Sequence, residues 1–273
     1  MAAAPYAHGT SASETFKKFF EASLTEQNQL LQELISATTD STPSESTLRQ
    51  LLDRVIKHYE DYYRYKSRWA KRDVMAMMTP AWRSSLEDAF LWIGGWRPSM
   101  AFHLLYSKAG LQLEAGLDEL LRGLSTGDLG DLSPAQLRRV DRLQRETIRK
   151  ERDLTETLAA QQETVADTSM VELSHAVTEL IRNGETTQTH GGWDESAVDG
   201  LVESTLRPKE DALEEILHKA DDLRLSTLKN IVEVLTPIQA VHFFIAATEL
   251  HLRVHDWGKR RDLKEDRRRE PRQ

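Results

Sequence analysis

The stretch from Leu91 to Ser99, LWIGGWRPS, is the most informative part of this sequence. Two tryptophans flank a Gly-Gly pair inside an otherwise helical apolar pattern. Glycine adopts backbone angles that other residues resist, proline suits the first turn of a helix, and indole rings provide a large contact area. We therefore expect a helix to end here, a tight buried corner to follow, and a second helix to begin at Pro98.

Helix-start signals recur outside this corner. A hydroxyl residue followed by proline, with Glu or Gln three positions after the hydroxyl, is typical of a capping box. Three segments carry this pattern: Thr42–Glu45, Ser133–Gln136 and Thr236–Gln239. Thr79-Pro80 repeats it without the acidic partner. Four glycines stand where helices are expected to end: Gly110, Gly123, Gly184 and Gly258.

No segment alternates apolar and polar residues between hairpin turns, so the sequence predicts an all-α fold. Caps and helical period predict helices over residues 13–37, 44–78, 80–93, 98–108, 111–123, 134–182 with an interruption near Thr168, 198–226 and 237–257. A polar loop is expected over residues 183–199. The last helices are too few to bury their own apolar surface, so we expect a single multi-helix bundle of long antiparallel helices.

The predicted domain spans residues 13–258, after a flexible N-terminus over 1–12. Residues 259–273 are expected to form a disordered, charged C-terminal tail. Two basic clusters lie in it, Lys259–Arg261 and Arg267–Arg269, among acidic residues. Such clusters fit a nuclear import signal or a nucleic-acid tether, and equally a solvated chain end, so we expect the protein in the nucleus and cytoplasm.

Composition excludes several function classes. The chain has 273 residues, 44 of them acidic and 36 basic, and its net charge of −8 disfavours binding to phosphate backbones. It has no cysteine, which excludes disulfides, thiolate nucleophiles and cysteine metal sites and suggests an intracellular protein.

No apolar run approaches the roughly 20 residues needed to span a bilayer, so we expect no membrane association. Because phosphate-loop, nucleophile-elbow and zinc-hydrolase motifs are also missing, we expect no enzymatic activity.

The last predicted helix carries the candidate ligand residues. His251 and His255 lie one turn apart on a flank that they share with Phe244, whereas His242 points elsewhere. Two imidazoles beside a phenyl ring can border a planar metal cofactor or a divalent cation. Taken alone, such a pair is more often two half-exposed helix histidines. His103, after Pro98, fits a core position.

Seven segments together resemble the plant delay-of-germination family, whose domain also forms the C-terminal part of TGA-type bZIP transcription factors. The segments are Phe19–Gln27, Thr79–Trp82, Leu91–Ser99, Leu132–Leu137, Leu206–Glu210, Leu235–Ala240 and His251–Gly258. The resemblance covers nearly all of residues 13–258. It implies a non-enzymatic helical regulator of seed dormancy, germination timing or abscisic acid signalling.

The same resemblance implies a cofactor. Members of the family bind haem through histidines on the segment that matches His251 and His255 here. Residues one turn apart have Cβ atoms roughly 5–6 Å from each other on the same side of a helix. The two imidazoles therefore cannot ligate opposite faces of one haem, and we expect one to ligate while its neighbour supports it. His242 is the alternative ligand.

The resemblance further implies protein partners. Members of the seed-dormancy branch bind type 2C protein phosphatases through their N-terminal region. We expect the matching segment here to form an amphipathic helix after Ser13 with the apolar residues Phe16, Phe19, Phe20, Leu24 and Leu31. The same stripe also fits an ordinary helix core. A homodimer is a further possibility that the sequence leaves open.

The basic region and zipper of the TGA factors would precede the shared domain. Because the stretch before Phe16 holds no Lys or Arg, we expect no direct DNA binding through that device. Two alternatives to phosphatase regulation stay open: a transcriptional co-regulator that acts with DNA-bound partners, and a carrier of haem or another small molecule.

Overall fold

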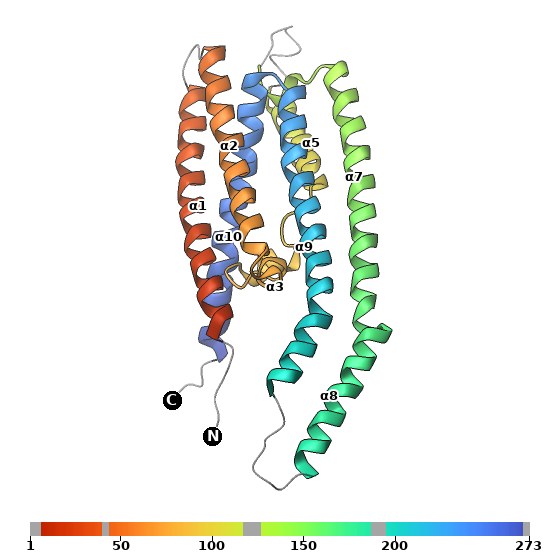
Figure 1. Cartoon of the computed structure of the whole chain (residues 1–273). Helices are drawn as coiled ribbons and strands as arrows, with labels where there is room; N and C mark the ends of the chain where they lie inside the picture. The colour runs from red at the N-terminus through yellow and green to blue at the C-terminus, as the bar shows by residue number, and fades with distance from the viewer. Residues whose placement is uncertain (1–6, 40–43, 117–126, 187–194, 270–273) are drawn as a thin grey trace.

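The computed structural model describes residues 7–39, 44–116, 127–186 and 195–269, and over these ranges the chain is all-α without a β-strand. The long helices are α1 (Ala7–Thr39), α2 (Glu45–Ala70), α7 (Pro134–Glu163), α9 (Glu195–Val234) and α10 (Pro237–Arg269). They lie side by side along the molecule, and the start of α1 and the end of α10 are at the same end of the bundle (Figure 1). The predicted bundle of long antiparallel helices is confirmed.

The described residues also form shorter elements: α3 (Val74–Met78), α4 (Ser85–Ala89), α5 (Ser99–Ala115), the 3₁₀ turns η1 (Leu129–Asp131) and η2 (Thr164–Ala166), and α8 (Thr168–Thr186). The turn η2 lies where the interruption near Thr168 was expected. Both α8 and the start of α9 extend beyond the other helices, at the bottom of Figure 1. No helix within the described ranges is long and apolar enough to cross a bilayer.

The corner over residues 92–95 is a two-residue turn. The N–H of Trp92 donates to the carbonyl of Gly95 at 2.8 Å, and the N–H of Gly95 donates back to Trp92 at 3.1 Å. Both central residues have positive φ, 42° at Ile93 and 62° at Gly94. This combination defines a type I′ turn, in which glycine relieves the strain that a side chain would add. The predicted tight buried corner is confirmed, and α5 starts directly after Pro98.

Two of the three predicted capping boxes form as expected. Ser133 and Gln136 exchange side-chain and backbone hydrogen bonds at the start of α7. Thr236 and Gln239 do the same at the start of α10. The third helix starts later than predicted, because Ser44 is the N-cap of α2. Thr42 and Pro43 lie outside the described residues.

Several predicted helix boundaries are wrong. The helix expected over 44–78 breaks after Ala70, since the Asp73 carboxylate accepts from the N–H of Ala76 and starts α3. The helix expected over 80–93 shrinks to α4, which Ser84 and Glu87 cap with a box that the sequence reading missed. Gly110 lies inside α5 and does not end it. Residues 117–126, with most of the helix predicted over 111–123, lie outside the described residues.

Three further boundaries are corrected. α1 begins at Ala7, earlier than the expected flexible N-terminus over 1–12 allows. α9 runs from Glu195 to Val234 and passes through Pro208, so the loop expected over 183–199 is shorter at both ends. α10 passes Gly258 and continues to Arg269, so residues 259–269 are helical and not a disordered tail. The remaining tail, 270–273, lies outside the described residues.

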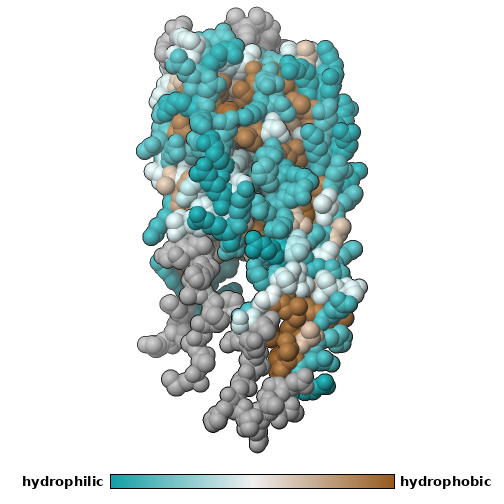
Figure 2. All heavy atoms as spheres, in the orientation of Figure 1, coloured by the Kyte–Doolittle hydropathy of each residue, from teal (hydrophilic) through white to brown (hydrophobic). Residues whose placement is uncertain are grey.

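Buried apolar side chains form two clusters along the bundle. One joins α1, α2, α5, α7, α9 and α10 and includes Phe102, Phe243 and Phe244. The other lies beside the corner and includes Phe16, Phe20 and Trp82. The face drawn in Figure 2 is mainly hydrophilic, with apolar residues visible in its upper half and gathered over the projecting end of α8 and α9. Exposed side chains there include Leu180, Ile181 and Leu201.

Candidate functional site

The two candidate ligand histidines lie on the flank of α10 that faces α1 and α4. Nδ1 of His251 is 2.8 Å from Oε1 of Gln27 on α1. Nδ1 of His255 is 2.9 Å from Oε2 of Glu87 on α4. The ring of Phe20 meets the His255 ring edge-on, with 5.6 Å between centroids. The structure thus brings the two imidazoles to one flank, as predicted, and ties each one to a different helix.

Phe244, the third candidate cofactor residue, is separate from these contacts. Its side chain is fully buried and packs against Phe243 and the ring of Tyr59, with centroids 5.4 and 6.2 Å away. It lies two helical turns before His251 in the main core. In this conformation Phe244 is a packing residue and does not border the imidazoles.

His242 and His103, the other two histidines considered from the sequence, differ in their surroundings. His242 is half-buried, with Nδ1 3.4 Å from the side-chain amide of Gln112, and desolvation lowers its pKa. His103 is exposed on the outer side of α5, whose buried positions include Ala101, Phe102 and Leu105. The expectation that His103 is a core residue is therefore wrong, because the buried stripe of α5 passes beside it.

Glu87 is the central acidic group of this flank. Its Oε2 accepts from the Ser84 N–H at 2.8 Å and from the Ser84 hydroxyl at 2.6 Å, besides contacting His255. Desolvation alone would raise the pKa of Glu87, but the hydrogen bonds from His255 and Ser84 outweigh it and lower the pKa to about 2. Glu87 is therefore ionised at neutral pH and accepts hydrogen bonds on this flank.

The surroundings of His251 determine its protonation. His251 is exposed at the surface of α10, yet desolvation by the protein atoms near its ring, with the nearby charge of Arg83, lowers the pKa of His251 to about 4. At neutral pH this imidazole is uncharged, so the proton on one ring nitrogen donates to Gln27 Oε1 and the other nitrogen keeps its lone pair.

The end of α10 docks tightly onto α4. A Cβ at Gly258 would lie 2.1 Å from the hydroxyl oxygen of Ser84, so only glycine fits here. Beside it, Lys259 Nζ donates to the carbonyl of Arg83 at 3.1 Å, and one turn on, Asp262 accepts from the N–H of Ser85 at 3.0 Å. These contacts explain why the helix continues through a glycine that local sequence signals mark as a stop.

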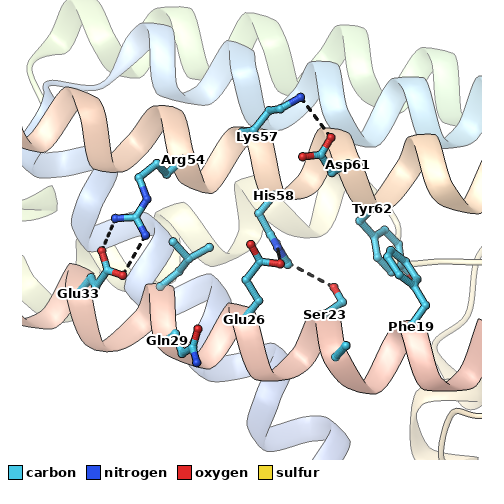
Figure 3. A pocket seen from close by; sticks show the side chains of 12 residues that line it. Phe19, Ser23, Glu26, Gln29, Glu33, Arg54, Lys57, His58, Asp61 and Tyr62 are labelled. Carbon is cyan, nitrogen blue, oxygen red and sulfur yellow. Dashed lines mark hydrogen bonds and ion pairs between the residues drawn. The ribbon is translucent and has the colours of Figure 1, made fainter.

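A surface groove of about 320 Å³ runs between α1 and α2. Apolar side chains of Phe19, Ala22 and Leu30 line it together with polar ones from both helices. Figure 3 shows two ion pairs at the rim of the groove. Glu33 of α1 pairs with Arg54 of α2 across the opening, and Lys57 pairs with Asp61 along α2. The groove therefore combines an apolar floor with a rim of alternating charge.

Three polar residues in the groove form a hydroxyl, imidazole and carboxylate series. The Ser23 hydroxyl lies 3.4 Å from Nε2 of His58, and Nδ1 of His58 lies 3.2 Å from Glu26. The order matches that of a hydrolytic triad. However, the Glu26 side chain is 64% exposed, and the backbone N–H groups around Ser23 are used within α1, so they cannot stabilise an oxyanion. The three side chains hold one another in place in the wall of the groove. They lack the hydrogen-bond donors for an oxyanion that hydrolysis requires.

The four candidate partner-binding residues divide into two pairs. Phe16 and Phe20 are buried, at 0% and 3% exposure, in the cluster beside the corner. Phe19 and Leu24 are only partly buried, and Phe19 lines the groove while its ring stacks on Tyr65 at 3.8 Å. In the folded chain, Phe19 is therefore the aromatic residue of this set that a partner can reach in the groove.

Sequence reasoning missed a buried polar network at the corner. Arg224 of α9 is fully buried and donates from Nε to the carbonyl of Trp96 at 2.7 Å and from Nη2 to Ile93 at 2.8 Å. Asp221 pairs with Arg224 and with Lys66, whose Nζ lies 3.0 Å away. No local pattern signals this network, because its members come from α2, α9 and the turn.

Comparison with known proteins gives consistent relatives. A family model described as "DOG1: Seed dormancy control" matches residues 29–107. Protein DOG1-like 3 of Arabidopsis thaliana is 32% identical over 79% of this chain and 73% of its own length. Protein DOG1-like 1 of the same plant is 31% identical over 86% of each chain. Transcription factor TGA2 of Arabidopsis thaliana is 29% identical over 87% of this chain and 59% of the factor.

Proposed function

Since this chain belongs to the DOG1 family, we propose that it regulates seed dormancy and germination by binding other proteins, without catalysing a reaction. A regulatory role follows from its DOG1-like and TGA relatives. Abscisic acid signalling is the setting that we propose for it, with type 2C protein phosphatases as the partners. The groove between α1 and α2 is the observation that carries this proposal.

The groove suits a protein partner for three reasons. It opens along α1, the helix in which the sequence resemblance places phosphatase binding. Its floor offers the part-exposed Phe19 and the exposed Ala22 to apolar side chains of a partner, with the buried Leu30 beneath them. Its rim offers the exposed groups of Glu33, Arg54 and Lys57, with side chains 44%, 58% and 56% exposed. A buried apolar contact inside a polar rim is the usual anatomy of a protein interface.

We predict that Ala22→Arg weakens phosphatase binding by about tenfold or more, because a long cationic side chain then fills the groove. Ala22 is exposed, so the change leaves the core contacts of Phe16 and Phe20 intact. Isothermal titration with a recombinant type 2C phosphatase measures the effect. Asn28→Arg is the matched control, since Asn28 is exposed on the same helix and does not line the groove. Equal affinities of the two variants would contradict docking in the groove.

We also propose haem as a bound regulator, held at the α10 flank. The described residues contain no group of three or more His, Cys, Asp or Glu that could hold a bare metal ion. Haem supplies four nitrogen ligands of its own, so the protein has to add only an axial one. His255 fits that role, because Glu87 at Nδ1 orients the ring and leaves Nε2 as the nitrogen that would bind the iron.

Two buried polar atoms near this flank support the fit. Nε1 of Trp82 and Nε of Arg83 are buried without a hydrogen-bond partner among the described residues. The Arg83 charge is close enough to His251 to lower the pKa of that histidine. A cation with an unused donor beside an imidazole suits the propionate groups of haem. The Phe20 ring of α1 contacts His255. Haem held at His255 would therefore also affect the position of α1, the helix that forms one wall of the groove.

We predict that His255→Ala lowers haem affinity by about tenfold or more and shifts the Soret band, since it removes the axial ligand. His251→Ala is expected to have the smaller effect, because that imidazole supports its neighbour. The measurement is a haem titration by absorption spectroscopy on the intact chain. His242→Ala on the same helix is the control, and a Soret band that is the same in all three variants would remove the assignment.

A second candidate function is transcriptional co-regulation, which the similarity to TGA2 favours. In this case the chain would bind DNA-bound proteins and not DNA itself. The compartments that we propose are nucleus and cytoplasm. The basic cluster Arg267–Arg269, in the last described turn of α10, is the candidate import signal.

A further inference from the structure

The C-terminal half of α10 exposes a tryptophan on a face that also carries several basic residues. Trp257 is 55% exposed, and Leu250, two turns before it on the same side, is 43% exposed. Large apolar side chains clustered on a surface often mark an interaction site. Tryptophan is also among the residues that contribute most to the affinity of protein interfaces.

The charged residues around Trp257 on this face are all cations. Helix geometry places positions three, four and seven residues away beside it, and among these are Arg253, Arg260, Arg261 and Lys264. We call the set Leu250, Arg253, Trp257, Arg260, Arg261 and Lys264 the α10 stripe. Asp256 and Glu265 pair with Arg260 and Arg261 from its edges, and those arginine side chains remain 70% and 64% exposed.

The opposite side of the same helix segment is fixed to the bundle. Gly258 lies directly against Ser84, and Asp262 accepts from the N–H of Ser85. The next residue after Gly258, Lys259, donates to the carbonyl of Arg83. The stripe is therefore presented on an anchored helix, so a partner would not have to order it first, which lowers the entropic cost of binding.

We propose that the α10 stripe docks an acidic amphipathic helix of a partner protein, whose apolar side chains pack around Trp257. The complementary charge comes from the four basic side chains, and Trp257 with Leu250 supplies the desolvated centre. This surface and the α1–α2 groove share no residue, so the inference stands independently of the phosphatase proposal.

A protein partner fits the stripe better than nucleic acid or membrane does. The whole chain carries a net charge of −8, which repels a polyanion that extends beyond the stripe. Nucleic-acid surfaces without sequence preference stack successive bases on several aromatic rings, and the stripe has a single one. A membrane-bound helix needs a broad apolar face, whereas here two apolar side chains stand among four cations.

The test uses the full chain and a labelled synthetic peptide of about 18 residues, with Leu at helical spacing and Glu elsewhere. Binding is followed by fluorescence anisotropy at low and high salt. A peptide with Lys in place of Glu, a duplex oligonucleotide and vesicles of phosphatidylcholine with phosphatidylserine are the comparison probes. The variants are Trp257→Ala and the double change Arg253→Glu with Arg261→Glu, and retained thermal unfolding temperatures confirm that both fold.

We expect the acidic peptide to bind the unchanged protein, and each stripe variant to weaken that binding by about tenfold or more. Leu111→Ala and Arg145→Glu are matched controls, since Leu111 on α5 is 63% exposed and the Arg145 side chain on α7 is 71% exposed, and we expect changes below about twofold. An acidic peptide that does not bind, or that binds the stripe variants equally well, overturns the proposal. Tighter binding of the oligonucleotide or the vesicles, lost in Trp257→Ala, overturns it in favour of that probe.

Discussion

Arg224→Met is expected to lower the free energy of unfolding by about 3–5 kcal/mol, the largest effect expected for a substitution in this chain. The guanidinium is fully buried and donates to backbone carbonyls of the corner, at Trp96 and Ile93. It also pairs with Asp221 and lies over the Trp92 ring, 5.3 Å from its centroid. Methionine has a similar length but leaves the carbonyls without donors and Asp221 with one cation fewer.

Urea unfolding followed by circular dichroism measures this loss. Arg207→Met is the control, because Arg207 lies on the same helix with its side chain 71% exposed and pairs with Glu203 at the surface. A change below about 0.5 kcal/mol is expected there, as for most surface substitutions. If the two variants unfolded at the same urea concentration, the network around Arg224 would not hold the corner to α9.

Gly94→Ala is the second large expected effect, with a loss of about 3 kcal/mol or more in the free energy of unfolding. Gly94 has a φ of 62°, which costs a side-chain-bearing residue about 1–2 kcal/mol. In addition, an added Cβ would lie 2.5 Å from the carbonyl oxygen of Met77 and 2.7 Å from Cδ1 of Leu217. The carbonyl belongs to the backbone and cannot move aside cheaply, so overpacking adds about 1–3 kcal/mol.

Two other glycines separate these two causes. Gly127 has a φ of 67° with nothing near the position of an added Cβ, so Gly127→Ala is expected to show the conformational cost alone. Gly110 lies inside α5 with open space around it, so Gly110→Ala is expected to stabilise the chain by about 0.5–1 kcal/mol. Thermal unfolding of the three variants gives the comparison. A loss at Gly94 no larger than that at Gly127 would show that the corner yields to the added methyl group.

Helix boundaries that depend on near neighbours are predictable from the sequence, whereas boundaries that depend on distant contacts are not. The boxes at Ser133 and Thr236 formed as predicted, because a cap involves residues three positions apart. The stop predicted at Gly258 failed, since the reason for that glycine is its contact with Ser84, far away in the chain. A glycine can mark either a helix end or a close contact between helices, and sequence alone does not separate the two.

The candidate site likewise combines features that helical spacing predicts with features that only the packing of distant helices sets. Helical spacing placed His251 and His255 on one flank, and the structure agrees. Their partners Gln27 and Glu87 lie on other helices, and no spacing along the chain predicts them. The resemblance to the family likewise pointed to α1 as the binding element, whereas only packing decided that Phe16 and Phe20 are buried and that Phe19 faces the groove.

The amino-acid sequence by itself determined the all-helical class, the family, the tight corner at residues 92–95 and the flank of α10 that carries two histidines. The family follows from the resemblance of segments spread over residues 13–258, whereas the other three features follow from sequence patterns within about two helical turns. The tertiary structure alone decided the buried network of Arg224, the continuation of α10 to Arg269 and the side chains left exposed for partners. These features depend on contacts between distant segments, whose free energy outweighs local preference once the helices pack.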